Sequence, residues 1–200
     1  MGLNEKFDYY IFEKTCIWIS NNRAQRERYR YTVNFSRTTL CNPFCAVNIR
    51  RIMEQYGIKP SVLSVEIMED KAMPAAEKER MMATLRELRQ IGVSILIDDF
   101  GSEYASYGDM QNLAGLVDII KIDKSITQTI GSESGLSVFR NIVRTAKELG
   151  LRIVCEGVET KEQEAIVTDA GCDMIQGFYY YRPMPVSQFE KLCEDNAAAE

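Results

Sequence analysis

The sequence predicts a parallel α/β fold, and two observations carry that prediction. Short runs rich in β-branched residues alternate along the chain with longer stretches of helical character, most of them closed by glycine. The runs are almost continuously apolar, as in Val93–Ile97 (VSILI), which is typical of buried strands in a parallel sheet. Regular alternation of strands and helices indicates a parallel sheet and not an antiparallel sandwich.

The expected elements follow one another in strict order. Strands are predicted at 28–36, 62–68, 93–97, 117–122, 152–155 and 173–175. Helices are predicted at 4–27, 44–56, 75–90, 134–149 and 160–170, with a short last helix before frayed residues at 196–200. Glycines 57, 92, 150 and 171 follow four of these helices, and glycine ends helices well because it adopts the left-handed conformation.

Bulk composition excludes several function classes. A length of 200 residues supports a domain with a sizeable core, and a net charge of -5 without a basic tract argues against a duplex nucleic-acid partner. The chain has no histidine, so imidazole bases and imidazole metal ligands are excluded. The six cysteines form no CxxC pair and are expected to be reduced thiols in a cytoplasmic protein. No apolar run is long enough to predict a membrane segment.

Polar residues recur at one place in the predicted fold, at or just past the carboxyl end of each strand. In parallel α/β folds these ends gather at one edge, where the functional site lies. The sequence therefore predicts a site at this edge, built from Asn34, Glu66, Asp98, Lys121, Glu156 and Gln176.

The adjacent acids Asp98 and Asp99 are the centre of this pattern. Neighbouring residues on a strand point to opposite faces, but at a strand end that runs into a loop both can reach one site. Paired acids after a buried strand are costly without a nearby cation. The alternative is that the pair caps the next helix or is solvated in a loop.

The chemistry of these residues favours a hard divalent cation. Asn34, Glu66, Asp98 and Asp99 offer oxygen ligands, which select Mg²⁺ or Mn²⁺ over zinc, and two such cations suit phosphodiester hydrolysis. Glu156 could take a proton from the attacking water, and Lys121 could orient that water. A Schiff-base role for Lys121 is the alternative, which neighbouring acids disfavour by keeping the amine protonated.

The ordered motifs resemble those of the EAL domain family. They are VNFS around Asn34, VEIME around Glu66, IDDFG, IKID around Lys121, CEGVET around Glu156 and IQGFYYYRPMP around Gln176. The resemblance implies a (β/α)8 TIM-type barrel that hydrolyses cyclic di-GMP with Mg²⁺ or Mn²⁺ in bacterial second-messenger signalling. It also implies that Asn34, Glu66, Asp98 and Asp99 bind metal, that Lys121 positions the water, and that Glu156 is the general base or a metal ligand. Gln176, Glu69 and Asp123 would support the substrate or the loops around it.

Two features depart from the family pattern. The Glu-Ala-Leu segment itself is absent, so residues 1–200 are expected to be a single EAL-type domain, truncated at its N-terminus, with about six of eight strands. An open barrel of this kind is expected to form a homodimer or to bind a partner chain. Glu103 also stands where the family usually has glycine, in the loop after IDDFG.

Three functions remain open at this point. The first is a cyclic di-GMP phosphodiesterase with impaired activity, favoured by the presence of Lys121 and Glu156. The alternatives are a catalytically inactive module that binds cyclic di-GMP and one that binds another protein. Tyr179–Tyr181 are expected to pack in the barrel, with guanine stacking as the alternative.

Overall fold

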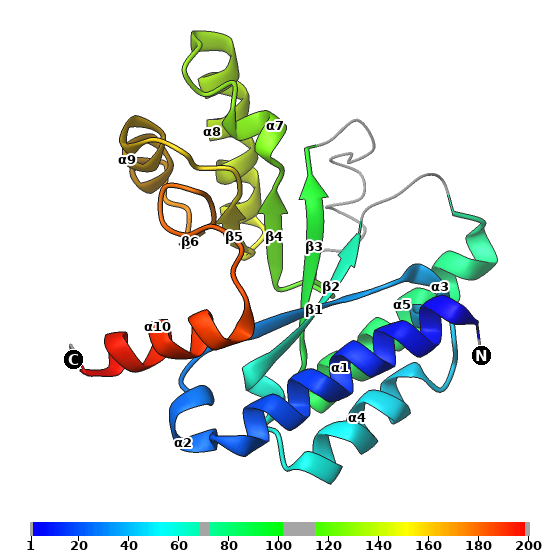
Figure 1. The fold of residues 1–200 in the computed structure, drawn as a ribbon. Coiled ribbons are helices and arrows are strands. Elements are labelled where there is room, and N and C mark those ends of the chain that lie inside the picture. Colours follow the sequence, from blue (N-terminus) through cyan, green and yellow to red (C-terminus); the bar gives the residue numbers. More distant parts are fainter. Residues whose placement is uncertain (1, 69–72, 102–114, 199–200) are drawn as a thin grey trace.

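A computed structural model of the protein describes residues 2–68, 73–101 and 115–198. In these ranges the chain forms one parallel sheet whose six strands lie side by side in the order of the sequence (Figure 1). The strands are β1 (Tyr31–Phe35), β2 (Leu63–Met68), β3 (Ser94–Phe100), β4 (Ile119–Ile122), β5 (Arg152–Cys155) and β6 (Met174–Ile175). Sequential parallel order is that of a TIM-type barrel, and here the barrel is incomplete. The predicted α/β class is confirmed.

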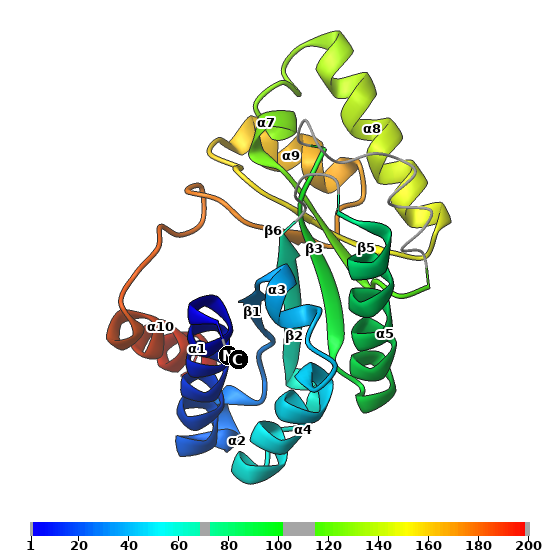
Figure 2. The same cartoon turned by 90° about the vertical axis from the view of Figure 1, so that its right-hand side faces the viewer.

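The helices form two groups on the sheet. Helices α1, α4 and α5 lie next to one another beside β1–β3, while α8 and α9 lie beside β4–β6 (Figures 1 and 2). The longer helices are α1 (Leu3–Asn21), α4 (Cys45–Tyr56), α5 (Ala75–Ile91), α8 (Glu133–Glu148), α9 (Lys161–Asp169) and α10 (Val186–Ala198). The short ones are α2 (Arg23–Arg26), α3 (Arg37–Leu40), η1 (Pro60–Val62) and α7 (Lys124–Thr127).

The core lies mainly between the sheet and these helices. The rings of Phe12 on α1 and Phe35 on β1 are both fully buried, and they meet edge to face with centroids 5.6 Å apart. On the other face of the sheet a smaller cluster packs inside the incomplete barrel, formed by Leu96, Ile119 and Val154. Burial of both faces explains why the strands read as continuous apolar runs.

Most differences from the predicted elements concern short helices. The expected helix over 4–27 is interrupted at Asn22, whose φ of -149° is not helical, so that α1 and α2 are separate. Helices α3 and α7 were not predicted. Each is a single turn whose N-cap side chain, Ser36 for α3 and Asp123 for α7, accepts a backbone N–H. The C-terminal helix reaches Ala198, further than the fraying expected from 196 onward.

The C-terminal helix α10 packs against α1, as both ribbon views show (Figures 1 and 2). The indole N–H of Trp18 donates to Glu190 Oε1 at 2.7 Å, and the guanidinium of Arg26 pairs with the same carboxylate at 2.6 Å. Phe189 adds a ring contact to Trp18 at 6.0 Å. The far end of the chain is thereby fixed beside its first helix. None of the helices within the described ranges has the length and apolar character needed to cross a membrane.

Candidate functional site

A buried lysine lies at the centre of the polar cluster at the carboxyl edge of the sheet. The Lys121 ammonium is 2.6 Å from Glu66 Oε1, 2.8 Å from Asp98 Oδ1 and 2.6 Å from Glu156 Oε1. Glu66 and Lys121 are only 4% and 8% exposed. Since an ammonium has three N–H donors, these three carboxylates use the whole donor capacity of Lys121.

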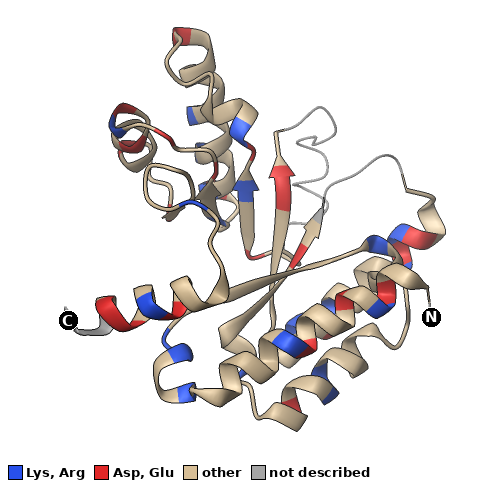
Figure 3. Ribbon diagram, viewed as in Figure 1, with Lys and Arg blue, Asp and Glu red and all other residues tan. Residues whose placement is uncertain are grey.

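The strand register explains why these four side chains meet. Glu66 lies opposite Leu96, and Asp98 is two residues beyond Leu96, so both acids point to the same face of the sheet. Lys121 lies two residues beyond Ile119 and opposite Val154, and Glu156 lies two residues beyond Val154. The polar cluster is therefore the next layer above the apolar cluster of Leu96, Ile119 and Val154. Figure 3 shows the acidic segment near the end of β3 beside the basic segment on β4.

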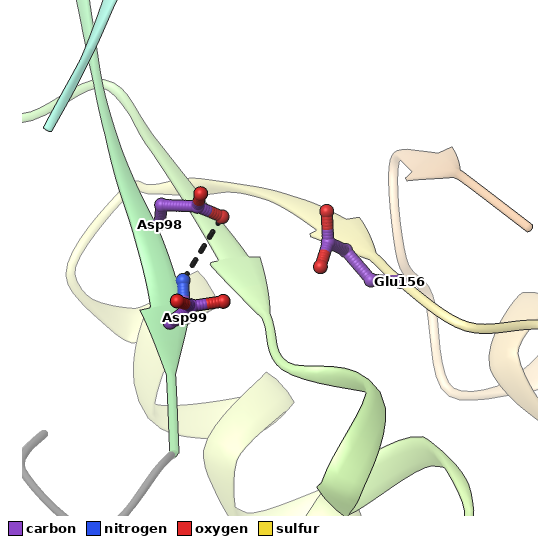
Figure 4. A group of neighbouring side chains, drawn as sticks. All are labelled: Asp98, Asp99 and Glu156. Carbon is purple, nitrogen blue, oxygen red and sulfur yellow. Dashed lines mark hydrogen bonds between the residues drawn. The ribbon is translucent and has the colours of Figure 1, made fainter. Parts of the chain in front are cut away.

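A β-bulge brings Asp99 to the same place as Asp98. The β3–β4 register shifts between Ile97 and Phe100, where β3 carries one residue more than β4. Asp99 has a φ of 53°, and its backbone N–H donates to Asp98 Oδ1 at 3.0 Å. As a result, one oxygen each of Asp98, Asp99 and Glu156 lie within 4.8 Å of one another, and their carboxylates converge between the ends of β3 and β5 (Figure 4).

Burial and excess negative charge shift the ionisation of this cluster. Burial alone would lower the pKa of Lys121, but its hydrogen bonds to Asp98, Glu156 and Glu66 raise it above the ordinary value. Burial and the neighbouring Asp98 raise the pKa of Glu66, although its hydrogen bond to Lys121 opposes the shift. Burial and the charges of Asp98, Asp123 and Glu156 likewise raise the pKa of Asp99. The lysine stays protonated, and one cation faces an excess of carboxylates.

This donor set fits a hard divalent cation. Asp98, Asp99 and Glu156 form a group of three carboxylates that could hold a metal ion. Oxygen-only ligands and uncompensated negative charge are what Mg²⁺, Mn²⁺ and Ca²⁺ prefer. Glu66 contacts the group through Lys121, and Asn34 is exposed but lies directly opposite Glu66 in the β1–β2 register. The structure thus brings six of the predicted site residues to one edge: Asn34, Glu66, Asp98, Asp99, Lys121 and Glu156.

The family assignment rests on the length of the match. The profile of the EAL domain family matches residues 1–183. The chain belongs to the EAL domain family. It is 31% identical over 193 residues to "Cyclic di-GMP phosphodiesterase NbdA" of Pseudomonas aeruginosa, covering 96% of this chain and 24% of that protein. It is also 31% identical over 186 residues to "Cyclic di-GMP phosphodiesterase PdeF" of Escherichia coli, covering 92% and 24%.

A solved EAL-type structure agrees with this assignment. The PaMucR phosphodiesterase in complex with c-di-GMP superposes with a TM-score of 0.80 at 29% identity, over 92% of this chain and 79% of that one. The EAL domain described here spans about a quarter of the length of the curated relatives named above.

Other predicted residues of this EAL domain lie around the cluster. The Asp123 carboxylate accepts the Ser125 N–H at 2.9 Å as the cap of α7. Gln176 has an exposed side chain, while its backbone N–H donates to the Cys155 carbonyl at 2.8 Å. Glu69 and Glu103 lie outside the described residues. The prediction that Tyr179–Tyr181 pack in the barrel is wrong: these three residues are 40%, 45% and 54% exposed.

Two glycines of the EAL domain were not recognised as part of the site from sequence. Gly157, directly after Glu156, has a φ of 70°, and a Cβ there would be 2.5 Å from the Lys124 Cβ. A Cβ on Gly177, directly after Gln176, would be 2.0 Å from the Val158 carbonyl oxygen. The repeated pairs Glu-Gly and Gln-Gly at strand ends were the available signal. Glycine lets the chain pass closely at both turns.

Proposed function

We propose that this EAL domain is a phosphodiesterase that hydrolyses cyclic di-GMP to the linear dinucleotide in the cytoplasm, and that residues 1–200 act as one domain. The observation that carries the proposal is the convergence of Asp98, Asp99 and Glu156 beside the buried Lys121. The names of two relatives and the bound ligand of PaMucR support cyclic di-GMP as the substrate.

In this proposal the acids hold Mg²⁺ or Mn²⁺ at the strand ends. Asp98 and Asp99 would be the principal ligands, with Glu66 and Asn34 from the two preceding strands. A divalent cation there would polarise a phosphate oxygen and acidify a bound water. The excess of carboxylates over ammonium groups supports this role, because a second positive charge would relieve the repulsion among them.

In this proposal Glu156 transfers protons, and Lys121 stabilises the negative charge that develops in the reaction. Glu156 would accept the proton of the attacking water, and its hydrogen bond to Lys121 fixes the direction of its carboxylate. Lys121 would donate an N–H to that water or to a phosphate oxygen as negative charge develops there. Gln176 and Asp123 would support the turns that bound the site.

The first prediction tests the base. Glu156→Gln keeps the shape and the capacity to accept a hydrogen bond but cannot take the proton, so turnover of cyclic di-GMP should fall at least about a hundredfold. Affinity for cyclic di-GMP, measured with the metal site of each variant saturated, should change little, since the loss then falls on the transition state. Chromatographic detection of the linear product with Mn²⁺ measures turnover, and calorimetry with Ca²⁺ measures binding. Glu159→Gln is the matched control, because Glu159 is exposed outside the cluster.

The same measurements distinguish the phosphodiesterase from the alternative functions. A catalytically inactive cyclic di-GMP-binding module would bind the nucleotide and give no linear product in the parent or in either variant. Turnover in Glu156→Gln equal to that of the parent would remove Glu156 from the role of base. Absence of both binding and turnover would favour a module that interacts with another protein.

A further inference from the structure

The hydrogen bonds of Lys121 leave it no donor for a water or a substrate. All three N–H groups are directed to carboxylates, at 2.6, 2.8 and 2.6 Å. Charge-assisted bonds of this length are among the strongest in proteins. In this arrangement Lys121 can act on a phosphate or a water only after it gives up at least one of the three acids.

The acids that hold Lys121 overlap with those suited to a divalent cation. Asp98 and Glu156 belong both to the three partners of Lys121 and to the group of three carboxylates within 4.8 Å. Asp98 Oδ1 accepts two hydrogen bonds, one from Lys121 at 2.8 Å and one from the Asp99 N–H at 3.0 Å. A cation that binds these oxygens would lie next to the ammonium, and the two positive charges repel.

We propose that Lys121 is the resident counter-ion of the metal-free site, and that it competes with the divalent cation for Asp98 and Glu156. Without metal, the ammonium holds three buried or half-buried acids together and thereby keeps the ends of β2, β3 and β5 in place. With metal bound, Lys121 releases a shared carboxylate, and the freed N–H donor becomes available to water or phosphate. The inference rests on the proposed metal-dependent function and adds a coupling between metal binding and the donor state of Lys121.

The second prediction tests this competition by removing the charge. Lys121→Met should bind Mn²⁺ about tenfold more tightly than the parent in calorimetric titration, because no ammonium opposes the cation. In EDTA, its melting temperature should be several degrees lower, since the acids then face one another without a counter-ion. Added Mn²⁺ should raise the melting temperature of Lys121→Met by more than it raises that of the parent.

Two further variants control for charge and for lysine loss in general. Lys121→Arg keeps the positive charge and should not gain Mn²⁺ affinity. Lys147→Met removes a different ion pair, in which the ammonium lies 2.8 Å from Asp173 Oδ1. This variant should bind Mn²⁺ as the parent does. If Lys121→Met does not fold in EDTA, Lys121→Gln takes its place, and folding of either variant on addition of Mn²⁺ supports the proposal.

The outcomes distinguish the competition from the function on which it rests. Suppose that the parent binds Mn²⁺. If Lys121→Met and Lys121→Gln then bind Mn²⁺ no more tightly than the parent does, the competition alone is overturned. No Mn²⁺ binding in the parent or in any variant overturns both the competition and the metal-dependent function. Binding in Lys121→Met but not in the parent supports the competition in its strongest form.

Discussion

Asp98 is the residue on which the site depends most. One of its oxygens accepts from both Lys121 and the Asp99 N–H, so it fixes the lysine and the turn of the chain together. The hydrogen bond from the Asp99 N–H helps hold Asp99 at a φ of 53°, in a region of backbone conformation that aspartate tolerates better than most residues. The sequence shows two adjacent acids, but the bulge that directs both to one place is not visible in their identity.

The third prediction concerns Asp98 as a metal ligand. Asp98→Asn keeps the side-chain size and removes the charge, so Mn²⁺ affinity should fall at least about a hundredfold in calorimetric titration. Asp169→Asn is the matched control, since Asp169 is exposed on α9 and pairs only loosely with Arg140 at 3.6 Å. Affinity of Asp98→Asn equal to that of the parent would contradict the assignment of the site.

At the scale of elements, two pairs of strands are joined in the same way at the amino edge of the sheet: an aspartate before one strand accepts a backbone N–H of its neighbour. Asp118, just before β4, accepts the Ile95 N–H of β3 at 2.8 Å, and Asp173, just before β6, accepts the Ile153 N–H of β5 at 2.8 Å. A basic residue from the last turn of a helix pairs with each acid: Arg89 of α5, the helix before β3, pairs with Asp118, and Lys147 of α8, the helix before β5, pairs with Asp173. The repeat fixes strand register at the end opposite to the site.

The fourth prediction uses Asp173 and the pH. Burial opposes its ionisation, but hydrogen bonds from Lys147 and from the Ile153 N–H hold the pKa of Asp173 below its usual value. An acid with a lowered pKa stabilises the folded state above its unfolded pKa, near 3.9, and loses that contribution as the pH falls. Because Asp173 is exposed to solvent, which screens these interactions, Asp173→Asn should lower the free energy of unfolding by only about 0.5 kcal/mol at pH 7.

Denaturant unfolding at several pH values measures this effect. The gap between Asp173→Asn and the parent should close as the pH falls through the lowered pKa. The exposed Asp169→Asn should show no such gap at pH 7. A gap that persists unchanged in acid would mean that the charge of Asp173 is not the stabilising feature.

The elements that sequence predicted well are those with strong periodic or apolar signals. Strand β5 was predicted at its observed bounds because the apolar run Ile153–Cys155, preceded by Arg152, is set between a glycine-ended helix and an acid. Helices α3 and α7 were missed because a single turn has no periodicity, and only the caps Ser36 and Asp123 mark them. The polar strand ends were visible in the sequence, but Lys121 as the shared partner of three acids was not, since it depends on register between strands.

At the scale of the whole molecule, the sheet is open. Among the described residues β1 pairs only with β2, and β6 only with β5, so each has one free side along the sheet. Helix α1 beside β1 also carries exposed apolar side chains: Leu3, Phe7 and Tyr10 are 84%, 62% and 56% exposed. A groove of about 590 Å³ continues this surface between α1, the start of β1 and α10, lined in part by Ile11 and Phe189. Exposed apolar surface next to an unpaired strand typically marks an interface.

The last prediction is that a second copy of the chain covers this side. Two β1 edges related by a two-fold axis would run antiparallel, and the apolar faces of both α1 helices would be buried together. Light scattering should therefore give twice the 22.9 kDa of one chain at micromolar concentration. Phe7→Asp should shift the mass toward one chain, because it places a charge in the interface. Val138→Asp, at a similarly exposed apolar position on α8, should not. A parent that is a uniform single chain and binds no apolar dye would contradict the dimer.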